Sequence, residues 1–180
     1  VTLGLILLAG LYADFIFNRA IRLKMLLAEA LSGIDVQLKR RHDLIPNIVE
    51  AVKGYMRYEA AVLEQVTLLR NQAMKMDTVQ DKARAENRLS SALKHVFALA
   101  ENYPDLKANK SFLGLQSALI EVEDELQMSR RYYNGTVRNY NILIQSFPNN
   151  MVLSMFGFAS ASFFEKEYAT QRQNPDVKFS

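Results

Sequence analysis

The feature that most constrains the fold is a spacing of three or four residues between apolar side chains, repeated along most of the chain. This spacing places the side chains in one stripe on an α-helix, because a helix completes a turn about every 3.6 residues. The most regular stripe runs from Phe112 to Phe147, and Pro148 ends it. No stretch alternates apolar and polar residues as a half-buried strand does. The sequence therefore predicts an all-α fold.

An earlier stripe crosses a proline without losing its phase. Two interpretations of residues 14–76 stay open: one long helix kinked at Pro46, or two helices, the second beginning near Pro46 with Asp43 as its N-cap. The unbroken phase favours the single kinked helix. The stripe keeps a seven-residue step through Leu38, Ile45, Val52, Glu59, Val66 and Ala73.

Two further helix starts can be predicted from capping residues. Thr78 is followed three residues later by Asp81, a capping-box pattern that predicts a helix beginning there. Pro104 ends that helix, and a connecting segment with one helical turn comes after it. Asn109 or Ser111 is expected to cap the last long helix.

The N-terminal segment is predicted to be a membrane anchor. Residues 1–13 carry no charge, and Asp14 is the only charged residue before Arg19. An apolar helix of about 20 residues spans a bilayer, so residues 1–18 are predicted to be a transmembrane helix, with a cleaved signal peptide as the alternative. The basic flank that begins at Arg19 favours a cytoplasmic position for the rest of the chain, but the side of the membrane stays open. Residues 19–147 are then the helical bundle domain, and residues 148–180 an apolar tail with a short polar end.

The tail is unusual because residues 149–164 carry no charge. Three interpretations stay open: it folds back into the bundle, lies in a membrane interface, or joins neighbouring subunits. The candidate residues for subunit or lipid contact are Met151, Met155, Phe156, Phe158, Phe163 and Phe164.

A tyrosine–asparagine pair recurs one heptad apart in the last helix. Gly135 lies inside this repeat and costs about 1 kcal/mol relative to alanine in a helix, which suggests close approach by another backbone. Buried tyrosines with asparagines at the bundle edge are the favoured interpretation, and a polar network between helices is the alternative. The candidate helix-packing residues are Tyr133, Asn134, Gly135, Tyr140 and Asn141.

The composition offers little for catalysis. The net charge is +3, cysteine is absent, and the two histidines, His42 and His95, lie on different predicted helices, so no metal site or cofactor is predicted. No phosphate-binding loop or nucleic-acid motif is present, and no small-molecule substrate is predicted. The acidic run 121–125 is expected to be a solvated face. The basic run of Lys39, Arg40 and Arg41 is a candidate contact for lipid head groups, with an ordinary charged helix face as the favoured alternative.

Three segments, residues 37–55, 103–116 and 130–165, resemble the LemA family. They read QLKRRHDLIPNIVEAVKGY, YPDLKANKSFLGLQ, and RRYYNGTVRNYNILIQSFPNN with FGF and FFE after it. The resemblance implies a membrane-anchored bacterial protein with an antiparallel bundle of four long helices. We expect this protein at the bacterial inner membrane, which it would cross once. It brings no catalytic residues, because the family has no agreed biochemical activity.

The sequence thus predicts a non-enzymatic, membrane-anchored scaffold that self-associates and organises or remodels membrane. Its expected partners are membrane lipid and further copies of itself. The alternative is a monomeric adaptor that recruits another membrane protein, such as a protease or a sensor kinase, through an exposed groove. An enzyme would need titratable groups clustered inside the bundle, and none occur at helical spacing.

Overall fold

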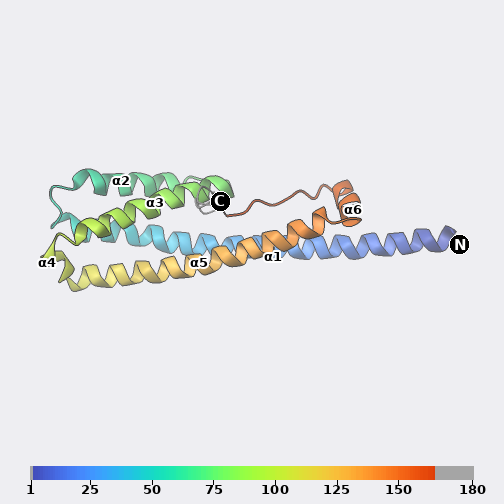
Figure 1. Cartoon of the computed structure of the whole chain (residues 1–180), viewed down its shortest axis with the longest axis horizontal. Coiled ribbons are helices and arrows are strands. Elements are labelled where there is room, and N and C mark those ends of the chain that lie inside the picture. Colours follow the sequence, from blue (N-terminus) through green and yellow to red (C-terminus); the bar gives the residue numbers. More distant parts are fainter. Residues whose placement is uncertain (1, 165–180) are drawn as a thin grey trace, which may run out of the picture. The chain divides into compact units, whose positions relative to one another are not determined.

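The computed structural model describes residues 2–164, and within them it contains helices and no strand, which confirms the all-α prediction (Figure 1). Four of these helices are longer than ten residues, which is the number that the family resemblance implied. The helices are α1 (Thr2–Lys53), α2 (Ala60–Ala73), α3 (Val79–Ala100), α4 (Pro104–Lys107), α5 (Lys110–Gln145) and α6 (Asn149–Met155).

The single kinked helix predicted over residues 14–76 is only half right. Helix α1 continues through Pro46, as predicted, but it ends at Lys53, and α2 begins at Ala60. The backbone N–H groups of Tyr55 and Met56 both bond to the carbonyl of Val52, which closes the last turn. The prediction was wrong because α2 resumes in phase after the break, so the buried stripe looks continuous in sequence.

The capping predictions are confirmed. Thr78 accepts a hydrogen bond from the backbone N–H of Asp81 at 3.1 Å and starts α3. Pro104 occupies the first turn of the short helix α4. The side chain of Asn109 accepts from the N–H groups of Ser111 and Phe112, at 2.9 and 3.1 Å, and starts α5. Each cap satisfies backbone donors that would otherwise lack a partner at a helix start.

The chain divides into two compact units. Unit 1 comprises residues up to 43 together with 117–163, and unit 2 comprises residues 44–116 together with Phe164. Both α1 and α5 contribute residues to each unit. The predicted boundary between residues 18 and 19 lies inside α1, which is continuous there. The polar end predicted after residue 164 lies outside the described residues.

Within unit 1, α1 and α5 run antiparallel. Arg40 of α1 pairs with Glu121 near the start of α5, at 3.6 Å. Far from that pair, Ile16 and Ala20 of α1 pack against Tyr140 of α5. Since the residue number rises along one helix as it falls along the other, the two helices have opposite directions.

Within unit 2, α2 and α3 lie side by side (Figure 1). Val66 in the apolar stripe of α2 and Leu89 in that of α3 are fully buried. The Tyr103 hydroxyl donates to the carboxylate of Glu59 at 3.1 Å and so ties the segment after α3 to the start of α2. These contacts close the core of unit 2.

No helix within residues 2–164 is long and apolar enough to cross a membrane. The transmembrane helix predicted over residues 1–18 therefore has no support in the structure. The apolar start of α1 includes Gly4, Gly10 and Tyr12, and it meets Asp14, all of which reduce its hydropathy.

Candidate functional site

The first four turns of α1 expose many apolar side chains. Leu3, Leu8 and Phe15 are 79%, 63% and 63% exposed. A helix of a water-soluble domain turns its apolar stripe toward the core and its polar residues outward. Exposed apolar side chains gathered in one region instead indicate a surface that contacts another molecule or a membrane.

Helix α6 adds further apolar residues to the same region of unit 1. The hydroxyl of Tyr12 donates to the side-chain oxygen of Asn149 at 2.7 Å, which joins α6 to α1. Met155 and Phe147 are 85% and 80% exposed. We call the exposed apolar residues at the start of α1 and in residues 147–156, which include α6, the apolar end: Leu3, Leu7, Leu8, Leu11, Phe15, Phe147, Met151, Met155 and Phe156.

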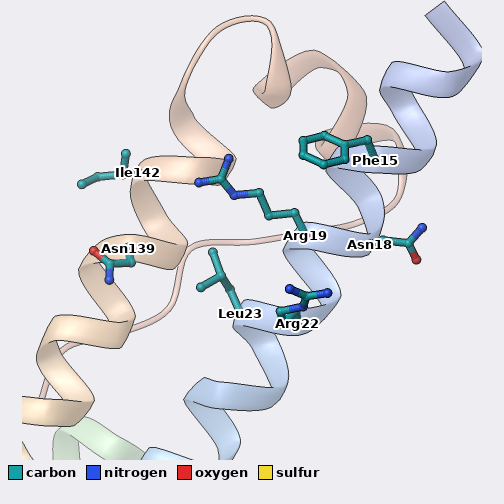
Figure 2. A pocket seen from close by; sticks show the side chains of 7 residues that line it. All are labelled: Phe15, Asn18, Arg19, Arg22, Leu23, Asn139 and Ile142. Atoms are coloured by element: carbon teal, nitrogen blue, oxygen red, sulfur yellow. The ribbon is translucent and has the colours of Figure 1, made fainter.

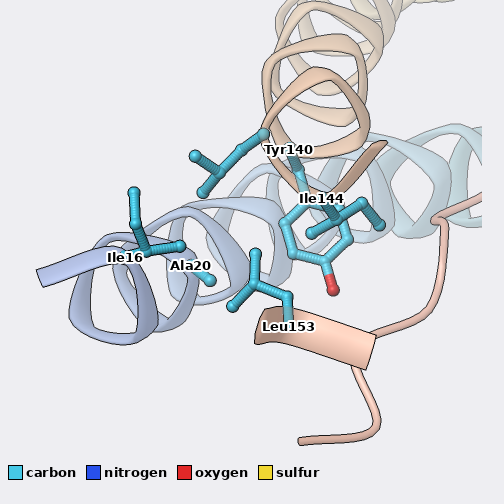
Figure 3. Close-up of a cluster of buried hydrophobic side chains, with 6 residues drawn as sticks. Ile16, Ala20, Tyr140, Ile144 and Leu153 are labelled. Carbon is cyan, nitrogen blue, oxygen red and sulfur yellow. The ribbon is translucent and has the colours of Figure 1, made fainter. Parts of the chain in front are cut away.

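A buried cluster fixes α6 in place (Figure 3). A helix of seven residues is too short to be stable alone, so it depends on tertiary contacts. Leu153 points from α6 toward Ile16 and Ala20 of α1 and Tyr140 and Ile144 of α5. Burial of a leucine side chain contributes about 1.5–3 kcal/mol, which makes Leu153 the main anchor of α6.

The Phe-Gly-Phe motif at residues 156–158 ends α6. Gly157 has φ of +74°, and the N–H groups of Gly157 and Phe158 bond to the carbonyls of Ser154 and Leu153. This pattern is a Schellman motif. Glycine is favoured at its left-handed position because residues that carry a side chain rarely adopt a positive φ.

The two phenylalanines of this motif flank one ring of α1. Phe156 and Phe158 meet Phe17 edge-on, with centroids 5.0 and 5.7 Å away. The Lys24 ammonium lies 5.9 Å from the centroid of the Phe158 ring. Aromatic pairs of this geometry add about 0.5–1.5 kcal/mol each beyond area burial. The motif therefore turns the chain and also fastens it to α1.

After Gly157 the tail folds back along α5 in an extended conformation. The amide of Asn141 donates to the carbonyl of Ala161 at 3.0 Å and accepts from its N–H at 2.9 Å. The Tyr133 hydroxyl donates to the carbonyl of Ser162 at 2.9 Å. Gln145 donates to the hydroxyl of Ser160 at 3.0 Å. We call Tyr133, Asn141 and Gln145 the tail clamp.

The clamp explains part of the tyrosine–asparagine repeat. Tyr133 and Tyr140 are both buried, and burial raises the pKa of each hydroxyl. The favoured interpretation of buried tyrosines fits their positions, but Tyr133 and Asn141 bind the tail backbone rather than another helix. Asn134 is half-buried. The close approach expected at Gly135 is not found among the described residues, since no atom beyond the adjacent turns of α5 lies within 4 Å of where its Cβ would be.

The tail candidates divide into two groups. Met151, Met155 and Phe156 belong to the apolar end, and Phe163 is also exposed. Phe158 is half-buried against α1 and α5, and Phe164 is buried within unit 2. The structure thus gives the first group, but not Phe164, a surface on which to meet a lipid or another subunit.

The candidate head-group residues 39–41 lie in different environments. Arg41 has no exposed surface, and its Nε lies 2.9 Å from a carboxylate oxygen of Glu123. Arg40 is exposed beside Glu121, and Lys39 is exposed as well. The prediction of a solvated acidic run therefore missed Glu123, whose partner is a buried cation. Lipid contact stays a prediction for Lys39 and Arg40, while Arg41 is out of reach of a head group.

An open cavity lies between α1 and α5 beside the apolar end (Figure 2). Its volume is about 540 Å³. Phe15, Arg19 and Leu23 point from α1 toward α5. In the sequence, the basic residues from Arg19 onward predicted only the orientation of the chain in the membrane. No sequence pattern indicated that Arg19 and Arg22 lie beside α5. The lining residues are Phe15, Asn18, Arg19, Arg22, Leu23, Asn139 and Ile142.

The described residues contain no group of three or more histidine, cysteine or acidic side chains placed to hold a metal ion. His42 is buried in unit 1, and His95 is exposed in unit 2. The polar groups that are brought together serve ion pairing, capping and the tail clamp.

Comparison with known proteins gives one family and several relatives. The LemA family model matches residues 30–179. Protein LemA of Metamycoplasma hominis is 27% identical over 168 residues, which cover 91% of this chain and 74% of that protein. Magnetosome protein MamQ 2 of Paramagnetospirillum magneticum is 29% identical over 85 residues, covering 47% of this chain and 31% of the relative.

A second MamQ relative matches a longer stretch. Magnetosome protein MamQ of Magnetospirillum gryphiswaldense is 20% identical over 164 residues, covering 77% of this chain and 60% of the relative. The chain therefore spans less than two thirds of the length of either MamQ protein.

Proposed function

Because the chain belongs to the LemA family and one end of its unit 1 exposes many apolar side chains, we propose that it is a membrane-associated helical scaffold without chemistry of its own. The apolar end is the observation that carries the proposal. It combines the start of α1 with α6, and Asp14 is the only acidic residue in either segment.

Contact with a bilayer accounts for these exposed residues. Transfer of one leucine, phenylalanine or methionine side chain out of water is worth about 1.5–3 kcal/mol, so a few of them suffice to bind a membrane surface. The start of α1 would enter the interface with Leu8 and Phe15, and α6 would lie beside it with Met151 and Met155. We place the protein at the bacterial inner membrane, in keeping with the family resemblance.

We also propose that copies of the protein associate through α6 and organise or remodel membrane. Met155 and Met151, which are four residues apart, share a face of α6 that no described residue covers. Methionine side chains adapt to irregular surfaces, which suits contact with another copy as well as with lipid. The name magnetosome protein, which the MamQ relatives carry, is in keeping with a role at a cellular compartment.

The test is the particle mass of the full chain extracted from its own membranes in mild detergent. A single large mass that contains only this chain is expected. The double variant Met151→Asp with Met155→Asp should lower the mass and ease extraction. A matched control changes Val36 and Ile120 to aspartate, which are 55% and 57% exposed and distant in sequence from α6. An unchanged mass and extraction in the α6 variant would contradict the proposal.

An adaptor is the second candidate, and a groove in unit 2 favours it. The groove, of about 670 Å³, lies between the end of α1 and α2, with Val49, Met56 and Leu63 among its lining residues. Charged Glu50, Lys53, Arg57 and Glu64 also line it. A partner helix with apolar residues at i, i+3 and i+7 fits such a groove. Extraction as a monomer, or in a particle shared with a second polypeptide, would favour this function over the scaffold.

A further inference from the structure

The cavity beside the apolar end combines two kinds of lining. Phe15, Leu23 and Ile142 supply apolar surface, and Arg19 and Arg22 supply positive charge (Figure 2). Binding sites for small amphiphilic molecules have this character, with apolar walls and a few placed polar groups. The question is which molecule the combination fits.

The two arginines lack partners within the part of the chain that the structure describes. Neither guanidinium makes an ion pair or hydrogen bond there. Residues three apart share a helix face, and two like charges at this spacing are destabilising by about 0.2–0.5 kcal/mol. α5 contributes Arg138 next to Asn139, and the nearest acidic residues along α1, Asp14 and Glu29, lie five residues before Arg19 and seven residues after Arg22. An anion in the cavity would relieve this repulsion.

Within unit 1, the half that holds the cavity carries an excess of positive charge. Residues 1–28 and 126–164, which lie in unit 1 apart from Phe164, contain six basic residues and one acidic residue. The rest of the chain contains 16 basic and 18 acidic residues, by subtraction from totals of 22 and 19. The net charge of +3 therefore hides a strongly basic region and a slightly acidic remainder. A basic region of this kind attracts an anionic surface.

The position of the arginines along α1 favours a lipid as the source of the anion. Leu8, Phe15 and Arg22 succeed one another at intervals of seven residues and so lie along one face of the helix. Arg19 lies four residues, or about 6 Å, beyond Phe15 along the helix axis. An exposed apolar surface thus passes into a pair of phosphate-binding side chains within about one turn. A phospholipid has the same succession, from acyl chain to phosphate.

We propose that this cavity binds the head group of an anionic phospholipid. The guanidinium groups of Arg19 and Arg22 bind the phosphate oxygens, since arginine matches their geometry with paired N–H donors. Phe15, Leu23 and Ile142 contact the carbon atoms next to the head group. The inference rests on the proposed membrane association and extends it by naming the lipid class and its ligands.

The test is flotation of the full chain with vesicles of phosphatidylcholine alone and with vesicles that also contain phosphatidylglycerol. Stronger binding to the mixed vesicles is expected. Arg19→Gln with Arg22→Gln should remove that preference, with a loss of about fivefold for each arginine and roughly thirtyfold for both. The matched control is Arg84→Gln with Arg88→Gln, which removes the same charge from two exposed arginines of α3.

The outcomes separate the two levels of the proposal. Equal binding of the unmodified chain to both vesicle types would overturn the head-group site and leave membrane association intact. Absence of binding to either would overturn the proposed function as well. An equal loss in the Arg84 and Arg88 control would assign the preference to net charge and overturn the site. Displacement by inorganic phosphate, beyond that caused by chloride at the same ionic strength, would make the ligand free phosphate rather than lipid.

Discussion

Replacement of Asn141 by alanine should release the tail from α5. The asparagine amide makes two hydrogen bonds with the backbone of Ala161, at 3.0 and 2.9 Å, and alanine makes neither. A hydrogen bond contributes about 0.5–1.5 kcal/mol net, so the two together hold the tail by about 1–3 kcal/mol. Since each 1.4 kcal/mol is a factor of ten, the tail should detach about 5 to 150 times more often.

Hydrogen–deuterium exchange measures this detachment directly. The N–H of Ala161 is protected only while it donates to Asn141, so its exchange rate should rise by the same factor. Asn139→Ala is the control: it makes the same substitution two residues away, at an exposed position that makes no hydrogen bond with the tail within the described residues. Exchange at Ala161 that stays unchanged in the Asn141 variant would refute the assignment of the clamp. Equal acceleration in both variants would show that the cause is a change in α5 rather than the lost hydrogen bonds.

Three further predictions concern unfolding. Glu123→Gln removes the charge opposite the fully buried Arg41 and should lower the free energy of unfolding, measured by chemical denaturation, by about 2 kcal/mol. The same change at Glu121, whose side chain is 68% exposed, should lower it by less than about 1 kcal/mol. Equal losses of stability in the two variants would contradict the role of burial. Gly135→Ala should raise the stability of the fold by about 0.5–1 kcal/mol, because the space beside this helical residue is open and alanine favours a helix. Gly157→Ala should lower the stability by about 1–2 kcal/mol, because φ is +74° at this position. Changes of melting temperature with the same sign in both variants would refute this reasoning. Burial raises the pKa of the Tyr133 hydroxyl, so the folded chain holds that proton more tightly than the unfolded chain does. The resulting stabilisation is fully present below the unfolded pKa of about 10 and is lost as the pH rises through the folded pKa. Tyr133→Phe should therefore reduce the loss of stability at alkaline pH, as measured by thermal melts at a series of pH values.

Most of the secondary structure could be predicted from the hydrophobic periodicity and the capping residues. The stripe that begins at Phe112 predicted α5, and the side-chain oxygens of Thr78 and Asn109 predicted two of the helix starts. These signals are local, because each depends on residues within one or two turns of one another. They can therefore be read without knowing what else the chain contacts.

The break after Lys53 shows what periodicity does not report. Val52 and Val66 are both fully buried and lie a multiple of seven residues apart, although they belong to different helices. A periodic stripe shows which residues face a core. The seven-residue spacing can continue across a break between two helices, so the spacing does not reveal that break. The continuous phase was therefore correct about burial and wrong about the helix.

The main polar contacts of unit 1 could not be predicted because their partners are far apart in sequence. Arg41 and Glu123 each looked like part of an exposed charged run, and only the antiparallel pairing of α1 with α5 brings them together. Tyr133 and Asn141 stood out, but their partners are backbone groups of the tail, which every residue carries. The cavity at Arg19 was hidden for the same reason.

The tail clamp has a consequence for how the tail can vary. Its contacts with Ala161 and Ser162 go to peptide groups, and the contact with Ser160 alone uses a side chain. Hydrogen bonds to peptide groups do not depend on the side chains of the tail, so the same backbone position can be held for many tail sequences. The exposed tail residues Ala159, Ser162 and Phe163 can therefore become more polar or more apolar while α5 continues to hold the tail, so the surface chemistry of this segment can diversify among related proteins without a change of fold.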